Sequence, residues 1–333
     1  MKVLILGGTK FVGRALVDAA LARGHDITLF NRGTTNPDIY PEIEKLRGDR
    51  DGNLDALKGR KWDAVIDTCG YVPRIVGMSA ELLADSVEHY TFISSISVYG
   101  PPMDANIDEN GAVQVMEDET VEEITGETYG ALKALCEQAA ESAMPDRVLS
   151  VRAGLIVGPH DPTDRFSYWT VKMARGGDVL VPPSSSVAQF IDVRDLSEWV
   201  MDMAEQRQAG IYNATGPNRT LTFTDIYRET QLAGGDKANL VEVSEEFILE
   251  NEVQGWSDLP VWLPESYAGM HTVKVDKIVE SGMKYRPLDQ TVNATLKWFK
   301  EERGLNDDLR AGLSADRETE LIAKWHESQK TEG

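Results

Sequence analysis

The stretch that decides the fold is the first thirteen residues, which read MKVLILGGTKFVG (residues 1–13). Residues 2–6 are almost all apolar, as expected for a central parallel strand that is buried on both faces. Glycines follow at once, and apolar side chains then recur at helical spacing as far as Leu21. A glycine-rich turn directly between a strand and a helix is typical of dinucleotide-binding sites, because the backbone can approach a diphosphate at the positive end of the helix.

The loop and the end of the next predicted strand indicate which dinucleotide is bound. An acid after the second strand, residues 27–30, would accept the ribose 2′-hydroxyl of NAD. The chain has Asn31 and Arg32 there, so no carboxylate repels a 2′-phosphate and a guanidinium can bind it, unless Arg32 is only a solvated loop residue. We therefore predict NADP in preference to NAD. The predicted cofactor contacts in the loop are Gly7, Gly8, Thr9, Lys10, Phe11, Val12 and Gly13.

Strands and helices continue to alternate, which predicts a parallel sheet with helices on both faces. Further strands are expected at residues 62–67, 89–94 and 147–152, and helices at 74–85 and 127–143. Asp49 follows a third strand and is either a contact of the adenine amine or an ordinary turn residue. The predicted fold is an α/β Rossmann domain over residues 1–155, with a doubly wound parallel sheet.

The pattern changes after residue 155, where proline, glycine and aromatic residues become frequent. Residues 156–333 are predicted to form mainly a smaller substrate-side α/β domain. Within them, residues 190–214 are expected to return to the Rossmann domain. Helices are predicted near the C-terminus at 291–302 and 314–327.

The composition is that of a globular protein with a strongly acidic surface. Apolar residues make up 41% of the chain and its formal net charge is −21. Such a surface repels phosphate backbones and anionic lipids, so neither nucleic acid nor a membrane is an expected partner. No apolar stretch approaches the ~20 residues of a membrane span, and the expected compartment is the cytoplasm. The five histidines and two cysteines have no metal-ligand spacing, so no metal is expected.

One helix carries a candidate catalytic pair. Tyr129 and Lys133 are four residues apart, which places the phenol and the ammonium on one helical face. A lysine close to a tyrosine lowers the pKa of the phenol and makes it a usable acid or base. A surface pair would have the same spacing. The serine-rich segment 94–97 ends the predicted fifth strand, where ligands bind in open α/β sheets.

The glycine loop, the serine-rich segment and the tyrosine–lysine pair follow one another along the chain in this order. In this arrangement the chain resembles the short-chain dehydrogenase/reductase superfamily. It is similar to the extended or atypical branch, the NAD-dependent epimerase/dehydratase group, with some likeness to chloroplast stem-loop-binding members. Later segments that carry the resemblance are RAGLIVGP (152–159), FIDVRD (190–195), YNATG (212–216), VDK (275–277) and YRP (285–287). It departs from the family at Lys10, which replaces the middle glycine, and at Asn31, which replaces the acid.

The resemblance implies roles for these residues. Tyr129 would be the general acid/base, Lys133 would bind the nicotinamide ribose and tune Tyr129, and Ser95 would hydrogen-bond the substrate oxygen. Asn31, Arg32 and Asp49 would join the loop in lining the cofactor. Relatives often pair through the helix that carries the tyrosine and lysine, which implies a homodimer.

The same resemblance narrows the reaction to hydride transfer at a carbonyl or hydroxyl carbon of a small carbonyl or nucleotide-sugar substrate. Related sugar dehydratases carry an Asp-Glu pair where this chain has Ile96 and Ser97, so dehydration is not expected. The basic residues favour a reductase or dehydrogenase. An epimerase that retains its NAD(P) is the alternative, and a non-catalytic NADP sensor or RNA-binding protein is a further one.

Residues that would contact the substrate are harder to assign. Ser97 follows the predicted catalytic serine, and His160, with Asp161 and Asp164 nearby, follows a Gly-Pro pair. Arginines bind diphosphates, so Arg165, Arg219 and Arg286 are candidates for contacts with a nucleotide-sugar ligand. An ordinary surface role is the more common one for such arginines. We take Ser97, His160, Arg165 and Arg286 as the candidate substrate residues.

Overall fold

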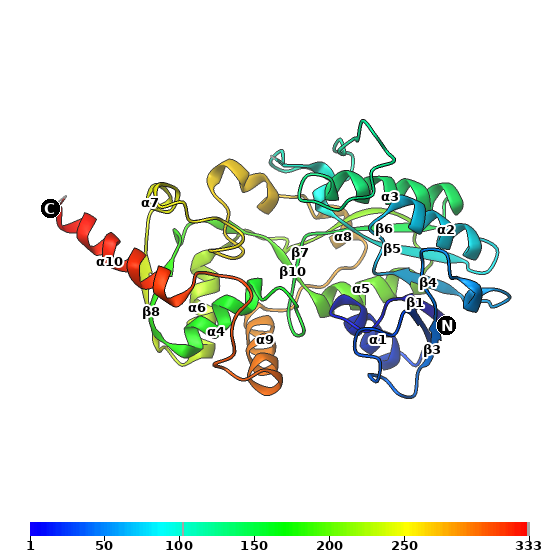
Figure 1. The fold of residues 1–333 in the computed structure, drawn as a ribbon, viewed down its shortest axis with the longest axis horizontal. Coiled ribbons are helices and arrows are strands. Elements are labelled where there is room, and N and C mark those ends of the chain that lie inside the picture. Colours follow the sequence, from blue (N-terminus) through cyan, green and yellow to red (C-terminus); the bar gives the residue numbers. More distant parts are fainter. Residues whose placement is uncertain (102, 332–333) are drawn as a thin grey trace. The chain divides into compact units, whose positions relative to one another are not determined.

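The computed structural model describes residues 1–101 and 103–331, which divide into two compact units. The first unit comprises Met1–Gly154, Val193–Gly216 and Val273–Lys284. The second comprises Leu155–Asp192, Pro217–Thr272 and Tyr285–Gly333. Figure 1 labels the elements of both units along the chain.

The first unit is built on a seven-stranded sheet in which every pair of neighbouring strands is parallel. The strand order is β11-β6-β5-β4-β1-β2-β3. The strands are β1 (Lys2–Leu6), β2 (Asp26–Asn31), β3 (Glu44–Arg47), β4 (Ala64–Asp67), β5 (His89–Ser95), β6 (Val148–Ala153) and β11 (Gly210–Ala214). Residues 3–6 of β1 are fully buried, as the apolar run predicted. The predicted doubly wound α/β fold is confirmed.

Helices cover both faces of this sheet. Helix α1 (Val12–Ala22) packs against α5 (Val193–Glu205), and α2 (Pro73–Leu83) packs against α3 (Tyr129–Ala143). Figure 1 shows the first pair on one side of the sheet and the second pair on the other. The short helix α8 (Asp276–Glu280) lies against β11, while the 3-10 turns η1 (Asp55–Leu57) and η2 (Ile96–Tyr99) follow β3 and β5.

Part of the first unit comes from late in the chain, which the sequence pattern did not indicate. The backbone N–H of Lys274 donates to the carbonyl of Ile107 over 2.9 Å. The side-chain amide of Asn213 in β11 donates to the carbonyl of Lys274 over 3.3 Å. The segment also buries the side chains of Val273 and Ile278, but so short an apolar run does not indicate in the sequence which unit it joins.

The second unit combines short strand pairs with helices. Parallel pairs are formed by β7 (Leu155–Val157) with β10 (Phe190–Asp192) and by β8 (Gly177–Val181) with β13 (Ala238–Glu242). The pair of β9 (Val187–Ala188) and β12 (Leu221–Thr222) is antiparallel. The helical segments are α4 (Arg165–Arg175), α6 (Phe223–Gly234), α7 (Glu245–Glu250), η3 (Glu265–His271), α9 (Leu288–Glu302) and α10 (Ala315–Thr331).

The core of the second unit is aromatic. Trp169 and Trp262 are fully buried, and the indole N–H of Trp169 donates to the carbonyl of Pro260 over 2.7 Å. The Trp169 ring meets Phe223 edge to face, with 5.6 Å between the ring centroids. These two tryptophans are therefore core residues. In the part of the chain that the structure describes, no helix combines the length and the apolarity needed to cross a membrane.

Candidate functional site

The glycine loop lies between β1 and α1, at the carboxyl edge of the parallel sheet. Gly7 and Gly8 have positive φ values of 109° and 89°, which glycine adopts without steric cost. A Cβ on Gly13 would lie 2.8 Å from the Cα of Gly8, so only glycine lets the first turn of α1 approach the loop this closely. This cradle of backbone at a helix N-terminus fits the diphosphate of a dinucleotide.

The remaining loop residues surround the start of α1. Lys10 is exposed and Thr9 is buried, and the carbonyl of Thr9 accepts a hydrogen bond of 2.8 Å from the side chain of Asn36. Phe11 immediately precedes α1 with a φ of 35°, and Val12 is its first residue. Lys10 is therefore an exposed residue of the loop, at the position where the middle glycine was expected.

Asn31 ties the end of β2 to the glycine loop. Its side-chain amide donates to the carbonyl of Gly7 over 2.9 Å, and its carbonyl oxygen accepts from the backbone N–H of Gly33 over 3.0 Å. Arg32 follows with 68% of its side chain exposed, and its guanidinium is 3.9 Å from the carboxylate of Asp49. At that distance and exposure the ion pair is weak, so the guanidinium is available to an anionic ligand.

Arg47 is a second guanidinium at the same edge, and the sequence analysis missed it. It is the last residue of β3, and it donates a hydrogen bond to the side-chain oxygen of Asn31. The guanidinium also lies close to the backbone of Gly33, because a Cβ added to that glycine would be 3.0 Å from the Cζ of Arg47. The ends of neighbouring parallel strands meet at one edge of a sheet, so the position of Arg47 at the end of the third strand was the available signal.

Asp49 lies in the turn after β3. Its backbone pairs with Asn53, and its carboxylate accepts from the backbone N–H of Asp51 over 3.1 Å. The next residue, Arg50, is buried and forms a two-pronged ion pair with the fully buried Asp67, with N–O distances of 2.7 and 2.6 Å. This buried pair fixes the turn to the end of β4 and so holds Asp49 at the carboxyl edge.

The predicted catalytic serine lies where β5 ends. Ser95 caps η2, and its hydroxyl accepts from the backbone N–H of Ser97 over 3.1 Å and donates to the Ser97 hydroxyl over 3.0 Å. Both side chains are half-buried. The two hydroxyls form one polar pair at the carboxyl end of the strand, so Ser97 belongs to the same site as Ser95.

A close approach at Gly130 brings the start of α3 against this serine segment. A Cβ on Gly130 would lie 2.1 Å from the carbonyl oxygen of Ser97, a distance that no real side chain tolerates. The preceding residue, Tyr129, is the first residue of α3 and is half-buried. Glycine at 130 therefore places the phenol-bearing turn beside the segment that carries Ser95.

Lys133, one helical turn further on, is buried and held by two main-chain acceptors. Its ammonium donates to the carbonyls of Gly70 and Ile93 over 2.8 and 2.7 Å. It also lies 4.2 Å from the ring centroid of Phe92 and 5.4 Å from that of Tyr71. Burial lowers the pKa of Lys133 from 10.5 to about 8. A buried ionisable group whose pKa is shifted this far is typical of functional sites.

Tyr71 joins the lysine to the tyrosine. Its ring centroid is 6.5 Å from that of Tyr129, with the two planes tilted by 39°. Tyr71 belongs to the loop after β4 whose residue Gly70 accepts from Lys133. The structure thus brings Lys133, Tyr71 and Tyr129 into one cluster at the carboxyl ends of β4 and β5.

A buried ionic network supports α3. The guanidinium of Arg152 in β6 binds the carboxylate of Glu137, at a shortest distance of 2.8 Å, and the hydroxyl of Tyr99 over 2.9 Å. Ser94, next to the predicted catalytic serine, donates to Glu137 over 2.5 Å. Because Glu137 lies one turn after Lys133, the network fixes the helix relative to the ends of β5 and β6.

The buried ammonium predicts an unusual dependence of stability on pH. An unfolded lysine titrates near 10.4, so between pH ~8 and ~10.4 the unfolded chain binds more protons than the folded one, and stability rises with pH. We expect the wild type to gain about 3 kcal/mol in free energy of unfolding relative to Lys133→Met as the pH is raised across this interval. Urea unfolding of both proteins over a pH series measures this difference. A difference that does not change with pH would contradict a buried, charged Lys133.

The other candidate substrate residues belong to the second unit, each with local contacts. The ring of His160 lies 3.5 Å from the carboxylate of Glu302 and meets Trp298 edge on. Arg165 lies over the Trp256 ring, 5.0 Å from its centroid. Arg286 is 3.9 Å from the carboxylate of the buried Asp192.

Asp164 is fully buried and accepts two hydrogen bonds from Arg303, over 2.7 and 2.8 Å. Arg219, the remaining arginine candidate, is exposed and lies 3.3 Å from Asp225 at the start of α6. Both residues make structural ion pairs within the second unit.

Comparison with known proteins adds to this geometry. A profile of the NAD dependent epimerase/dehydratase family matches residues 3–215. The chain belongs to this family. Its match covers the glycine loop, the serine segment and α3, so the predicted cofactor and catalytic residues lie within the part that matches the family.

One curated relative and many solved structures resemble this family member. The chloroplast stem-loop binding protein of 41 kDa b from Arabidopsis thaliana is 26% identical over 258 residues, which cover 70% of this chain and 63% of that protein. The match thus spans less than two thirds of that relative's length.

Among solved structures, the Bordetella bronchiseptica enzyme WbmH in complex with NAD+ is 15% identical, with a TM-score of 0.66. The match covers 90% of this chain and 99% of that enzyme. The Thermus thermophilus UDP-glucose 4-epimerase in complex with NAD is 17% identical, with a TM-score of 0.63, and the match covers 91% of this chain and 100% of that enzyme. At these identities the likeness shows the shared fold.

Proposed function

We propose that this chain is an NAD(P)-dependent oxidoreductase that transfers a hydride between nicotinamide and a carbonyl or hydroxyl carbon of its substrate. The observation that carries the proposal is the buried ammonium of Lys133, held by two main-chain carbonyls one helical turn from Tyr129. The close approach at Gly130 sets that turn against the serine segment. An acid–base side chain, a buried cation and a hydroxyl pair at one strand edge are what proton transfer at a substrate oxygen requires.

The glycine cradle is the proposed cofactor site. Gly7, Gly8 and Gly13 leave room for a diphosphate against the backbone amides that begin α1, with Thr9, Lys10, Phe11 and Val12 around it, and Asp49 on the adenine side. The nicotinamide ring, when bound, supplies or accepts the hydride.

The chain itself handles the proton. The Tyr129 phenol donates a proton to the substrate oxygen in the direction of reduction and removes it in the direction of oxidation. The Lys133 ammonium favours the phenolate electrostatically, which lowers the pKa of the phenol toward neutrality. The hydroxyl of Ser95, supported by Ser97, holds the substrate oxygen in place by a hydrogen bond. A nucleotide sugar or a small carbonyl compound provides such an oxygen.

We further propose that the cofactor is NADP. Arg32 and Arg47 bring two guanidiniums to the ends of β2 and β3, and Asn31 occupies the place of an acid that would repel a 2′-phosphate. Guanidiniums bind phosphate through paired, charge-assisted hydrogen bonds. NAD bound to the solved neighbours is the reason to test this preference directly.

Removing these two charges is expected to erase the preference. The variant Arg32→Gln/Arg47→Gln should bind NADPH about 10–100-fold more weakly, the loss of two charge-assisted contacts, while its affinity for NADH stays within about twofold. Arg60→Gln is the matched control, because Arg60 pairs with Glu44 at the opposite end of β3. Fluorescence titration with both reduced cofactors measures the change. Equal losses for NADPH and NADH would contradict a 2′-phosphate contact.

A nucleotide-sugar epimerase is the second candidate, favoured by the family profile and by neighbours such as the Thermus enzyme. An epimerase regenerates its cofactor in each turnover, whereas a reductase exchanges it. The purified protein should therefore be denatured and any released nucleotide identified. An empty site that binds NADPH supports the reductase, and retained NAD in near-equal amount to protein supports the epimerase. The net charge of −21 opposes RNA binding, so the activity named for the Arabidopsis relative is not carried over.

A further inference from the structure

A buried ion pair at the carboxyl edge of the parallel sheet has no part in the proton and hydride steps proposed above. It joins Arg50, in the turn after β3, to Asp67, the last residue of β4. The Asp67 side chain is fully buried, and only 9% of the Arg50 side chain is exposed. Taking two charges out of water is unfavourable unless the hydrogen bonds around them are complete. The contacts of the pair identify what it holds in place.

Every acceptor position of the Asp67 carboxylate is occupied. Its Oδ1 accepts from Arg50 over 2.7 Å and from the backbone N–H of Cys69 over 3.0 Å. Its Oδ2 accepts from Arg50 over 2.6 Å and from the Tyr90 hydroxyl over 2.8 Å. A carboxylate has about four lone-pair positions, so this one cannot turn without breaking a hydrogen bond. The fork of Arg50 thus fixes the carboxylate, and the carboxylate fixes the backbone at Cys69.

The next residue, Gly70, is wedged against the same carboxylate. A Cβ on Gly70 would lie 3.1 Å from Oδ2 of Asp67, 2.5 Å from a ring carbon of Phe92 and 2.7 Å from a methyl carbon of Val76. Only glycine leaves room for the backbone between these three side chains. The turn 67–70 is therefore held by the ion pair on one side and by core side chains on the other, which fixes the carbonyl of Gly70.

This carbonyl is one of the two main-chain acceptors of the Lys133 ammonium, at 2.8 Å. The Phe92 ring that confines Gly70 also lies 4.2 Å from the ammonium nitrogen at its centroid. Burial lowers the pKa of Lys133 to about 8, and the negative charge of Asp67 acts in the opposite direction. Other titratable side chains on the elements packed around the ammonium are those of Cys69, Tyr71, Tyr90, Tyr129, Cys136 and Glu137.

We propose that Arg50 and Asp67 are a positioning pair for the Lys133 ammonium, acting through the turn 67–70 and the carbonyl of Gly70. The value of the pair for catalysis rests on the proposed function, in which Lys133 acts on Tyr129. The placement of the ammonium does not require that function, so it is measured separately from turnover.

The variant Arg50→Met/Asp67→Leu removes both charges at once and leaves no buried charge unpaired. Such apolar replacements of buried pairs are often tolerated by the fold. Leucine cannot accept from the Cys69 N–H, so the carbonyl of Gly70 loses its support. We expect the pKa of Lys133 to fall by about one pH unit, the loss of one charge-assisted hydrogen bond. NMR titration of isotope-labelled lysine measures it, with Lys133→Met to assign the signal. A pKa that stays at about 8 would overturn the proposal.

The variant Lys172→Met/Glu318→Leu is the matched control. It removes a buried pair of the second unit, in which Glu318 also accepts from the backbone N–H of Leu180 over 3.2 Å. The pKa of Lys133 should not change in this variant. Equal falls in the two double variants would mean that any loss of a buried pair loosens the protein, which also overturns the proposal.

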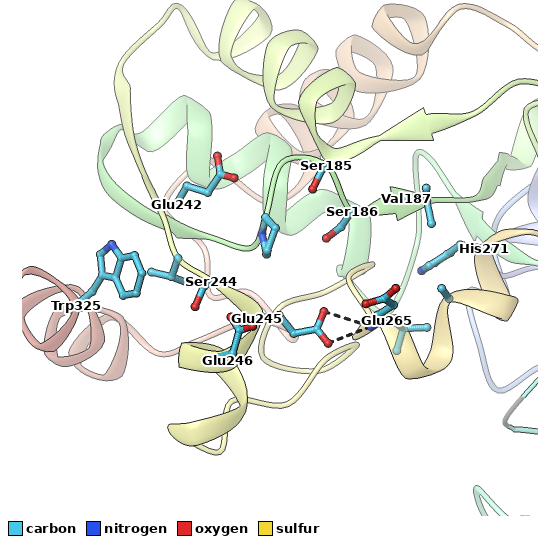
Figure 2. A pocket seen from close by; sticks show the side chains of 14 residues that line it. Ser185, Ser186, Val187, Glu242, Ser244, Glu245, Glu246, Glu265, His271 and Trp325 are labelled. Carbon is cyan, nitrogen blue, oxygen red and sulfur yellow. Dashed lines mark hydrogen bonds between the residues drawn. The ribbon is translucent and has the colours of Figure 1, made fainter. Parts of the chain in front are cut away.

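The single variant Asp67→Asn tests the charge of the carboxylate. Asparagine keeps an acceptor for the Cys69 N–H but leaves the Arg50 guanidinium unpaired, so the pKa of Lys133 should fall further than in the double variant. Glu245→Gln is its control, because both oxygens of that carboxylate accept from the backbone N–H of Glu265, over 3.1 and 3.2 Å (Figure 2). A pKa of Lys133 that is unchanged in Asp67→Asn would contradict the role of Asp67.

Turnover separates this proposal from the proposed function. The charged ammonium is lost as the pH rises through its pKa, so kcat should decline near pH 8 in the wild type and about one pH unit lower in Arg50→Met/Asp67→Leu. The KM for the substrate should stay within about twofold. A pKa that falls while the decline of kcat does not move would support the positioning pair and contradict the role of Lys133 in the reaction.

Hydrogen exchange of the wild type decides the matter if neither variant folds. A turn held by the Asp67 carboxylate requires the backbone N–H of Cys69 to be protected as strongly as those of β5. Rapid exchange at Cys69 would show that the carboxylate does not hold the turn, and would overturn the proposal.

Discussion

Replacing Tyr129 by phenylalanine is expected to lower kcat by about 10²–10⁴-fold, the range for loss of a general acid–base group, while cofactor affinity stays nearly unchanged. The ring would keep its packing against Tyr71 and lose only the hydroxyl that exchanges the proton. The measurement is steady-state turnover on a substrate accepted by the wild type, with NADPH affinity determined in parallel.

Tyr71→Phe is the matched control for this variant. It removes a hydroxyl from the neighbouring ring. The centroid of that ring lies 5.4 Å from the Lys133 ammonium nitrogen. We expect its kcat to stay within about tenfold of the wild type, because Tyr71 has no proposed proton to transfer. Equal activity of Tyr129→Phe and the wild type would refute Tyr129 as the acid–base group, and a greater loss for Tyr71→Phe would move that role to Tyr71.

Adding one methyl group at Gly13 is expected to weaken cofactor binding about 10–100-fold, because the new Cβ would lie 2.8 Å from the backbone of Gly8. Real Cβ atoms do not approach backbone this closely, so the loop must move away from α1. The amides that begin the helix would then lose their alignment on the diphosphate. Titration of Gly13→Ala with NADPH measures the loss.

Gly126→Ala provides the control for the same chemical change. A Cβ at Gly126 meets nothing within 4 Å, so this variant should bind NADPH as the wild type does. If Gly13→Ala also bound NADPH with wild-type affinity, the glycine loop would not be the diphosphate site. Thermal unfolding of both variants separates a local shift of the loop from a loss of the fold.

The fold was predictable because it depends on patterns that a sequence displays directly. The apolar run at 2–6, the glycines after it and the alternation of strands and helices were enough to indicate the parallel sheet, which the structure confirms. The return of residues 273–284 to the first unit was not predictable, because that segment is held by a few hydrogen bonds and a short run of buried apolar side chains, which indicates no partner in the sequence.

The site was predictable in part. Spacing alone placed Lys133 one turn from Tyr129, but it could not show that the ammonium is buried and held by the carbonyls of Gly70 and Ile93. Such backbone acceptors have no sequence signature. Arg47 was missed because its place beside Asn31 depends on how β3 pairs with β2.

The most direct test of the account is a crystal structure of the protein soaked with NADP+. We predict the diphosphate against the backbone of residues 7–13, the 2′-phosphate within hydrogen-bond reach of Arg32 and Arg47, and the nicotinamide ribose within reach of Lys133. Density for the dinucleotide away from this loop, or a nicotinamide ring remote from Tyr129, would contradict the proposed site and the reaction assigned to it.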